Sequence, residues 1–151
     1  MTDFYTDRGY EQKRQYELSP SMEDYLEMIY RLSKYEGYTR VNIIAESLNV
    51  KPASVTKMIK KLSNKNYLKY EKYGLIQLTK KGLQMGDYLL KRHNLLEEFL
   101  KTLGARGNLQ KQVERIEHHI SHDSFQILSD FLEFLHQNPD ILTRFHRFNK
   151  G

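Results

Sequence analysis

The chain has 151 residues, a formal net charge of +5 at pH 7 and no cysteine. The lack of cysteine excludes disulfides and thiolate metal sites, and no apolar run approaches the ~20 residues that span a bilayer. The first residues are polar and include no apolar core of a secretion signal, so we expect a cytoplasmic protein without membrane association.

Residues 1–18 show no sustained apolar period, and we expect them to form a flexible N-terminal arm. A helix should follow, with Ser21 as its N-cap and an apolar stripe that includes Tyr25 and Ile29. Asp24 would then lie in the first turn, where capping and the helix dipole favour an acid even without a ligand. Taken alone, Asp24 is therefore better explained by capping than by metal binding.

Residues 40–68 predict two helices joined by a tight turn. Ile43, Ile44 and Leu48 form the apolar face of the first helix. The second helix begins at Pro52, where a proline is tolerated because the first N–H groups of a helix are unpaired. Its outward face combines small, hydroxylic and cationic side chains, which suit a helix that enters the DNA major groove. The expected DNA contacts are Ser54, Thr56, Lys57, Lys60 and Lys61, and Lys72 in the segment that follows.

Residues 67–79 predict a β-hairpin, because aromatic and aliphatic residues alternate with charged ones and Gly74 lies near the turn. A helix-turn-helix followed by a hairpin is a winged helix. The stretch from Tyr38 to Tyr73 holds eight basic and two acidic residues, a net charge of +6, which leaves −1 for the rest of the chain. This segregation favours nucleic-acid binding, although any single lysine could also serve only solubility.

Thr79 is expected to cap a long helix that ends at Gly104, and two further helices are predicted over residues 109–120 and 124–136. The last of these is apolar around its circumference, so it must be buried on more than one side. In a chain of this size a second copy is the natural cover, and we expect a homodimer. The tail from Asn138 is expected to pack loosely.

Carboxylates and histidines recur at helical spacings in three separated segments. Residues three or four apart share one face of a helix, so each segment could offer ligands to one shared point. Oxygen and imidazole donors without sulfur suit divalent ions such as Mn²⁺ or Fe²⁺. Four carboxylates sum to −4, which two divalent ions would neutralise and one would not. The candidate ligands are Asp24, Glu27, His93, Glu114, Glu117 and His118.

Five motifs along the chain resemble signatures of the DtxR family of metal-dependent transcriptional repressors, in the order of that family. They are SMEDYLEMIY, SVTKMIKKL, YLKYEKYGLIQLT, RHNLLEEFL and VERIEHHIS. The resemblance implies a winged helix, a helical dimerisation domain and metal bound between them by the same six candidate ligands. It also implies repression of manganese-uptake genes, since iron-responsive relatives carry methionine where this chain has Asp24, and a carboxylate prefers the harder ion.

These observations predict a mainly α protein in three parts. The flexible arm over residues 1–18 precedes a winged helix-turn-helix domain over residues 19–79, with a small β-hairpin as its wing. A linker helix and a C-terminal helical metal-binding and dimerisation domain would occupy residues 80–151. We expect Mn(II), two ions per subunit, and a palindromic double-stranded DNA operator.

Other functions remain open from the sequence. One is a repressor of the same family that responds to iron or another divalent ion. Another is a winged-helix regulator that senses an organic ligand, with the acids merely solvated. A binuclear metallohydrolase is disfavoured, because the chain offers neither an additional general base nor the HExxH pattern of zinc proteases. We therefore expect no enzymatic activity and no organic substrate.

Overall fold

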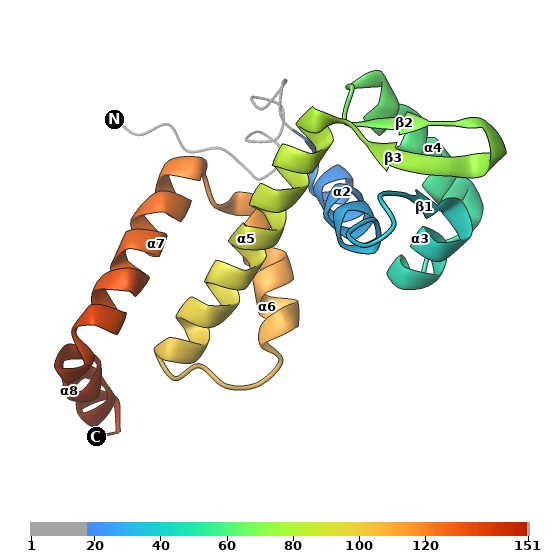
Figure 1. Ribbon diagram of the computed structural model, residues 1–151. Coiled ribbons are helices and arrows are strands. Elements are labelled where there is room, and N and C mark those ends of the chain that lie inside the picture. The colour runs from blue at the N-terminus through green and yellow to red at the C-terminus, as the bar shows by residue number, and fades with distance from the viewer. Residues whose placement is uncertain (1–17, 151) are drawn as a thin grey trace, which may run out of the picture. The chain divides into compact units, whose positions relative to one another are not determined.

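The computed structural model describes residues 18–150 and consists of helices with one small sheet (Figure 1). Contacts divide the chain into two compact units between Asp87 and Tyr88, and each unit is described by itself. The predicted mainly α fold with a winged helix-turn-helix is confirmed. The arm predicted over residues 1–18 lies outside the described residues, apart from Leu18. Among the described residues, no helix is both long and apolar enough to cross a membrane.

Helix α2 (Pro20–Leu32) opens the first unit, and Ser19 is its N-cap, with its Oγ accepting from the Met22 N–H at 3.2 Å. The prediction of Ser21 as the cap was wrong. Pro20 has no N–H and a fixed φ suited to the first helical position, so the residue before it becomes the cap. The acid in the first turn is then Glu23, and Asp24 lies beyond the positions that capping favours.

The helix-turn-helix follows as α3 (Val41–Leu48) and α4 (Pro52–Asn64), joined through Asn49 in the left-handed conformation with φ of 53°. Helix α4 begins at Pro52, as predicted. Helix α3 buries Ile44 and its neighbour Ala45, whereas Ile43 is 40% exposed, contrary to prediction. One stripe of so short a helix can face the core, and Ile43 precedes that stripe by a rotation of about 100°. The buried residues of α4 are Val55, Ile59 and Leu62.

The wing is an antiparallel sheet in the order β1-β3-β2. Its strands are β1 (Thr39–Arg40), β2 (Leu68–Tyr70) and β3 (Leu75–Leu78). Strand β2 pairs with β3 in the register Leu68 to Leu78, which confirms the predicted hairpin. Strand β1 was not predicted, because two residues are too few to show an alternating pattern.

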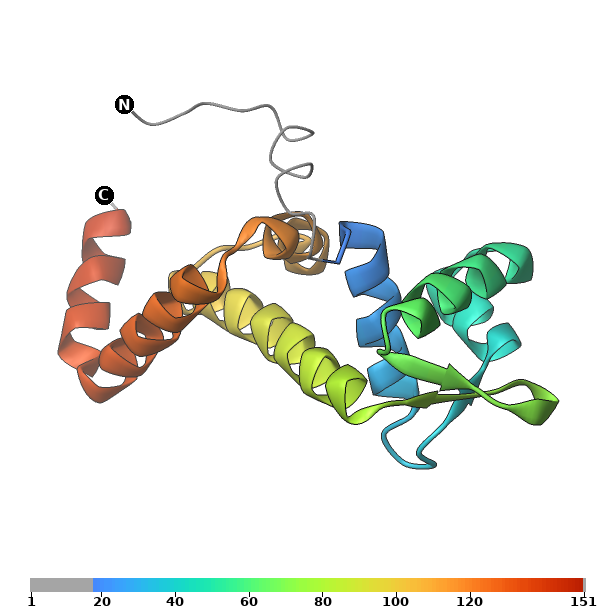
Figure 2. The same ribbon diagram turned by 90° about the horizontal axis from the view of Figure 1, so that it is seen from above.

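The turn of the wing bends at two consecutive residues of positive φ, Tyr73 at 67° and Gly74 at 75°. Left-handed geometry at both positions matches the twist of a hairpin, although it is costly for tyrosine. The guanidinium of Arg40 donates to the Tyr73 carbonyl at 2.7 Å and so braces this turn from β1. Figure 2 shows the turn of the hairpin standing clear of α3 and α4.

Helix α5 (Lys80–Thr102) packs against the rest of the first unit through two glycines. A Cβ at Gly82 would lie 1.9 Å from the Tyr67 carbonyl oxygen, and one at Gly86 would lie 2.6 Å from the Cβ of Tyr30. Thr79 accepts from the Gly82 N–H at 3.1 Å, so the predicted cap is confirmed.

Burial raises the pKa of the Tyr67 phenol, and the charge of Glu23 raises it further.

The second unit contains the part of α5 from Tyr88 onward and four further elements. They are α6 (Leu109–Ile116), the 3₁₀ turn η2 (Glu117–His119), α7 (His122–Gln137) and α8 (Pro139–Asn149). The single helix predicted over residues 109–120 was wrong, because the chain tightens into η2 and then extends at Ile120 before the Ser121 cap of α7. The tail from Asn138 forms α8, with Pro139 at its first position and no buried residue, which agrees with the predicted loose packing.

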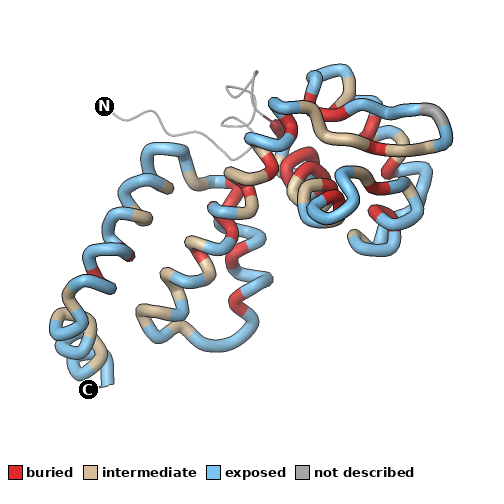
Figure 3. Tube along the Cα trace, viewed as in Figure 1, coloured by how far each residue is buried: buried red, intermediate tan, exposed pale blue. Residues whose placement is uncertain are grey.

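Helices α7 and α8 leave much of their apolar surface uncovered in the single chain (Figure 3). Two pairs of aromatic rings join α7 to α5. The ring centroids of Tyr88 and Phe125 are 5.3 Å apart, and those of Phe99 and Phe131 are 6.2 Å apart. On α8, His146 Nε2 lies 2.8 Å from the Thr102 carbonyl oxygen at the end of α5. We call the exposed apolar residues of these two helices the C-terminal apolar face: Ile127, Phe131, Phe134, Phe145 and Phe148.

Candidate metal centre and DNA-reading surface

Helix α2 carries two of the candidate ligands, Asp24 and Glu27, one turn apart and therefore on one side. Asp24 is exposed, whereas the side chain of Glu27 is only 15% exposed. Arg31 donates to Glu27 Oε2 through Nε at 3.1 Å and through Nη2 at 2.8 Å. Both bonds end on the same carboxylate oxygen, so Arg31 does not engage Oε1. Arg31 was not among the residues predicted from the sequence, although its i, i+4 spacing from the acid Glu27 was a signal for this contact.

The second unit brings three candidate ligands together. His93 on α5 and Glu117 on η2 are 24 residues apart, yet His93 Nδ1 lies 2.7 Å from Glu117 Oε2. His118 Nε2 lies 3.9 Å from Glu117 Oε1, and all three residues are buried. Glu97, one turn after His93, approaches His93 Nε2 at 3.9 Å and is itself paired with Lys101 at 2.8 Å. A buried carboxylate therefore lies beside two buried imidazoles.

Glu114 stands apart from this buried group. It lies on the exposed surface of α6 and accepts a hydrogen bond from Gln110 Nε2 at 3.1 Å. Their spacing in the sequence predicts that Glu114, Glu117 and His118 belong to one regular helix. The change from α-helix to 3₁₀ turn after Ile116 buries the last two residues and leaves the first at the surface.

The chemistry of these donors fits a divalent cation. A buried carboxylate and buried imidazoles are costly to desolvate unless they are paired or coordinate a metal. The bond between His93 Nδ1 and Glu117 is the kind of carboxylate contact that orients a metal-ligating histidine, because a proton on Nδ1 leaves the Nε2 lone pair available. The donors are oxygen and nitrogen only, which suits Mn²⁺ or Fe²⁺ by ligand type.

The outward face of α4 is cationic and polar. Ser54, Lys57, Lys60 and Lys61 are exposed, as predicted, whereas Thr56 is half-buried and its hydroxyl donates to the Pro52 carbonyl at 3.1 Å. The side chain of Lys72, the sixth residue expected to contact DNA, lies outside what the structure describes. Lys69 on β2 adds another exposed cation close to α4 in the fold.

Comparison with known families decides what kind of protein this is. Residues 17–76 match the model described as "Iron dependent repressor, N-terminal DNA binding domain". Residues 79–146 match "Iron dependent repressor, metal binding and dimerisation domain". The chain belongs to the iron-dependent repressor (DtxR) family. It is thus a metal-dependent, DNA-binding transcriptional regulator with a dimerisation domain, and the family and function predicted from its motifs are confirmed.

Curated relatives in this family align with the sequence of this chain over most of their length. The HTH-type transcriptional regulator MntR of Listeria monocytogenes is 50% identical over 125 residues, which cover 82% of this chain and 88% of the relative. The MntR of Lysinibacillus sphaericus is 46% identical over 127 residues, which cover 83% and 91% of the two chains. The sequence motifs also resemble those of the regulator MntR, and these relatives confirm that resemblance.

Solved DtxR-family structures share the fold. The manganese regulator SloR matches with a TM-score of 0.67 and 32% identity, over 78% of this chain and 55% of that one. The apo form of the manganese-activated repressor ScaR matches with a TM-score of 0.62 and 31% identity, over 74% and 54%. The chain thus spans about half the length of these solved relatives.

Proposed function

We propose that this regulator binds Mn(II), two ions per subunit, and represses manganese-uptake genes when that ion is plentiful. The observation that carries the metal site is the buried contact of His93 with Glu117 at 2.7 Å. Manganese is supported by similarity to the manganese regulator SloR and the manganese-activated repressor ScaR, and by a donor set without sulfur. The proposed ligands are Asp24, Glu27, His93, Glu114, Glu117 and His118.

Charge balance supports a divalent ion, and a titration measures how many ions bind. The four carboxylates and two neutral imidazoles of the proposed site sum to −4. The positive guanidinium of Arg31 beside Glu27 brings the net charge of the site to −3, so one divalent ion would leave −1 and two would leave +1. We propose two ions, because carboxylates from separate segments can bridge them. A titration of the metal-free protein with Mn²⁺ that reached saturation at one ion per subunit would overturn this number.

The proposed control of DNA binding rests on where the ligands lie in the chain. Asp24 and Glu27 belong to α2, which packs against both helices of the helix-turn-helix, while the buried donors His93, Glu117 and His118 belong to the second unit. Bound Mn²⁺ supplies the positive charge that lets acids from both units share one site. Without it these acids repel one another, and α4 is not held in the orientation that DNA requires.

The dimerisation domain makes the proposed DNA target two-fold symmetric. A homodimer presents two copies of α4, which reach successive major grooves when they lie about 34–36 Å apart. The operator would then be a palindrome, because its half-sites mirror the symmetry of the protein. Metal and operator would each strengthen the binding of the other, by a factor of roughly 5–150.

The test is fluorescence anisotropy on duplexes selected from a random pool in the presence of Mn²⁺. Affinity should rise with added Mn²⁺ in the wild type and rise much less in Glu114→Gln. Glu133→Gln is the matched control, because Glu133 is also exposed and also accepts from a glutamine four residues away, at 3.0 Å. A stronger response to Fe²⁺ would make the protein an iron regulator, and binding without any metal dependence would favour an organic-ligand sensor.

A further inference from the structure

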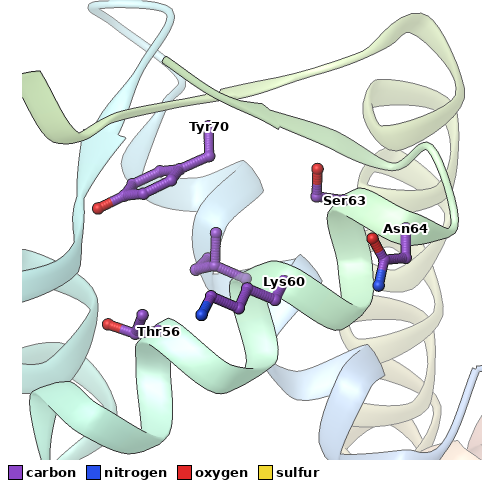
Figure 4. Close-up of a pocket in the computed structure, with 6 residues that line it drawn as sticks. Thr56, Lys60, Ser63, Asn64 and Tyr70 are labelled. Carbon is purple, nitrogen blue, oxygen red and sulfur yellow. The ribbon is translucent and has the colours of Figure 1, made fainter. Parts of the chain in front are cut away.

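A groove lies between the DNA-reading helix α4 and strand β2 of the wing, with a volume of about 250 Å³. Figure 4 shows Tyr70 of β2 lying over α4, with its hydroxyl toward the end where Thr56 lies and with Ser63 and Asn64 toward the other end. Lys60 lies along the helix between them. The lining residues are Thr56, Ile59, Lys60, Ser63, Asn64 and Tyr70.

The chemistry of the groove is that of an anion site. No acidic side chain lines it, and its floor is the fully buried Ile59. Within the described part of the chain, the side chains of Lys60, Ser63 and Tyr70 make no hydrogen bond or ion pair, so their donors remain available. Thr56 differs, because its hydroxyl already donates to the Pro52 carbonyl.

The surroundings of the groove add positive charge. Lys57 and Lys61 are exposed on the same helix, and Lys69 is exposed next to Tyr70 on β2. An ammonium group and a hydroxyl donor beside a shallow depression suit a tetrahedral oxyanion, and the positive net charge of this part of the chain repels cations. The groove also opens beside the helix that carries the expected base contacts near its N-terminus, so one long polyanion could reach both.

We propose that this groove seats a backbone phosphate of duplex DNA, with Lys60 and Tyr70 as the donors. The inference rests on the DNA-binding part of the proposed function and assigns it a specific subsite. Such a contact fixes the register and orientation of α4 on the duplex and reads no base, so it acts on every sequence. Tyr70 was missed in the sequence, because the spacing within α4 and within the hairpin does not show that β2 lies over α4.

The test uses full-length protein and a labelled mixed-sequence DNA duplex of about 30 base pairs, because a phosphate subsite needs no operator. Anisotropy is measured over a series of salt concentrations for Lys60→Gln and Tyr70→Phe. Lys60→Gln should weaken binding and reduce the slope of log affinity against log salt by about 0.9. Tyr70→Phe removes one hydroxyl and no charge, so affinity should fall about tenfold with the salt slope unchanged.

Two matched variants serve as controls. Tyr73→Phe removes the hydroxyl of a wing tyrosine that is 90% exposed and does not line the groove. Lys111→Gln removes an exposed lysine from α6 in the second unit. Both should bind the duplex as the wild type does, and thermal unfolding should show that all four variants fold.

The pair of groove variants decides the outcome. Wild-type affinity for Tyr70→Phe would overturn the subsite even if Lys60→Gln weakened binding, because Lys60 would then be an ordinary surface cation. The comparison is made with and without Mn²⁺. Loss of metal dependence in the wild type would contradict the proposed function, while the difference between the groove variants and their controls would still test the subsite.

Discussion

Glu117 is the residue on which the buried donors of the second unit depend. Its side chain contacts His93 at 2.7 Å and approaches His118 at 3.9 Å, and only 3% of the residue is exposed. Its carboxylate is thus the negative charge between two imidazoles. A carboxylate in this position orients the His93 ring and contributes to the binding of any cation that the two imidazoles hold.

Glu117→Gln should lower the affinity for Mn²⁺ by about 10–100-fold while leaving the metal-free fold intact. The amide keeps the volume and an oxygen that can accept from His93, but it removes the charge. Isothermal titration calorimetry on the metal-free protein measures the change, with the exposed Glu133→Gln as the control. Equal Mn²⁺ affinity in Glu117→Gln and wild type would remove Glu117 from the site.

A second prediction at this scale concerns Gly86. Alanine is a better helix former than glycine by about 1 kcal/mol, so propensity alone predicts a more stable Gly86→Ala. The new Cβ would meet the Cβ of Tyr30 at 2.6 Å, and overpacking of this kind costs about 1–3 kcal/mol. Gly86→Ala should therefore unfold at lower denaturant concentration than wild type, whereas the exposed Gln84→Ala should not. A more stable Gly86→Ala would mean that α5 does not pack closely on α2.

At the scale of elements, the C-terminal apolar face indicates which surface of the dimerisation domain pairs with another chain. Ile127 is 68% exposed and Phe148 is 85% exposed in the single chain, while the polar Gln126 is exposed beside them. Exposed apolar residues clustered on two contacting helices mark a surface for another protein chain. A second copy of the chain covers it in our account.

Ile127→Glu should convert the dimer into monomers, because a charge would be buried in an apolar contact. Analytical ultracentrifugation gives the mass of the species in solution. Gln126→Glu introduces the same charge at the neighbouring exposed position and should leave the dimer intact. A dimeric Ile127→Glu would place the interface elsewhere on the second unit.

The elements also show how far sequence reasoning reaches. The start of α4 at Pro52 was predictable, because a proline has one favourable place in a helix. The turn η2 was not, since three residues of tighter winding leave no period to detect. Helix α8 was missed although its signals were present, because Pro139 suits a first helical position and Ile141, Leu142, Phe145 and Phe148 recur at helical spacing. For the site, spacing paired Asp24 with Glu27 correctly along one helix. The contact between His93 and Glu117 joins segments 24 residues apart, which only tertiary packing creates.

At the scale of the whole molecule, we propose that acids of α2 and buried donors of the second unit bind the same ions. Metal binding and DNA binding are then one linked equilibrium, because whatever orients the first unit favours the operator. Neither unit alone would show this linkage. The DtxR-family fold supplies the DNA-binding and dimerisation domains, and the proposed shared ligands would make DNA binding respond to metal.

The most direct measurement is a double-mutant cycle on Mn²⁺ affinity, by calorimetry, with Glu27→Gln, Glu117→Gln and the double variant. If both carboxylates serve the same ions, the double variant should lose little more affinity than the more damaging single variant. The two losses would then be strongly non-additive. Losses that simply add, or an unaffected Glu27→Gln, would show that the two units do not share a metal site and would contradict the account.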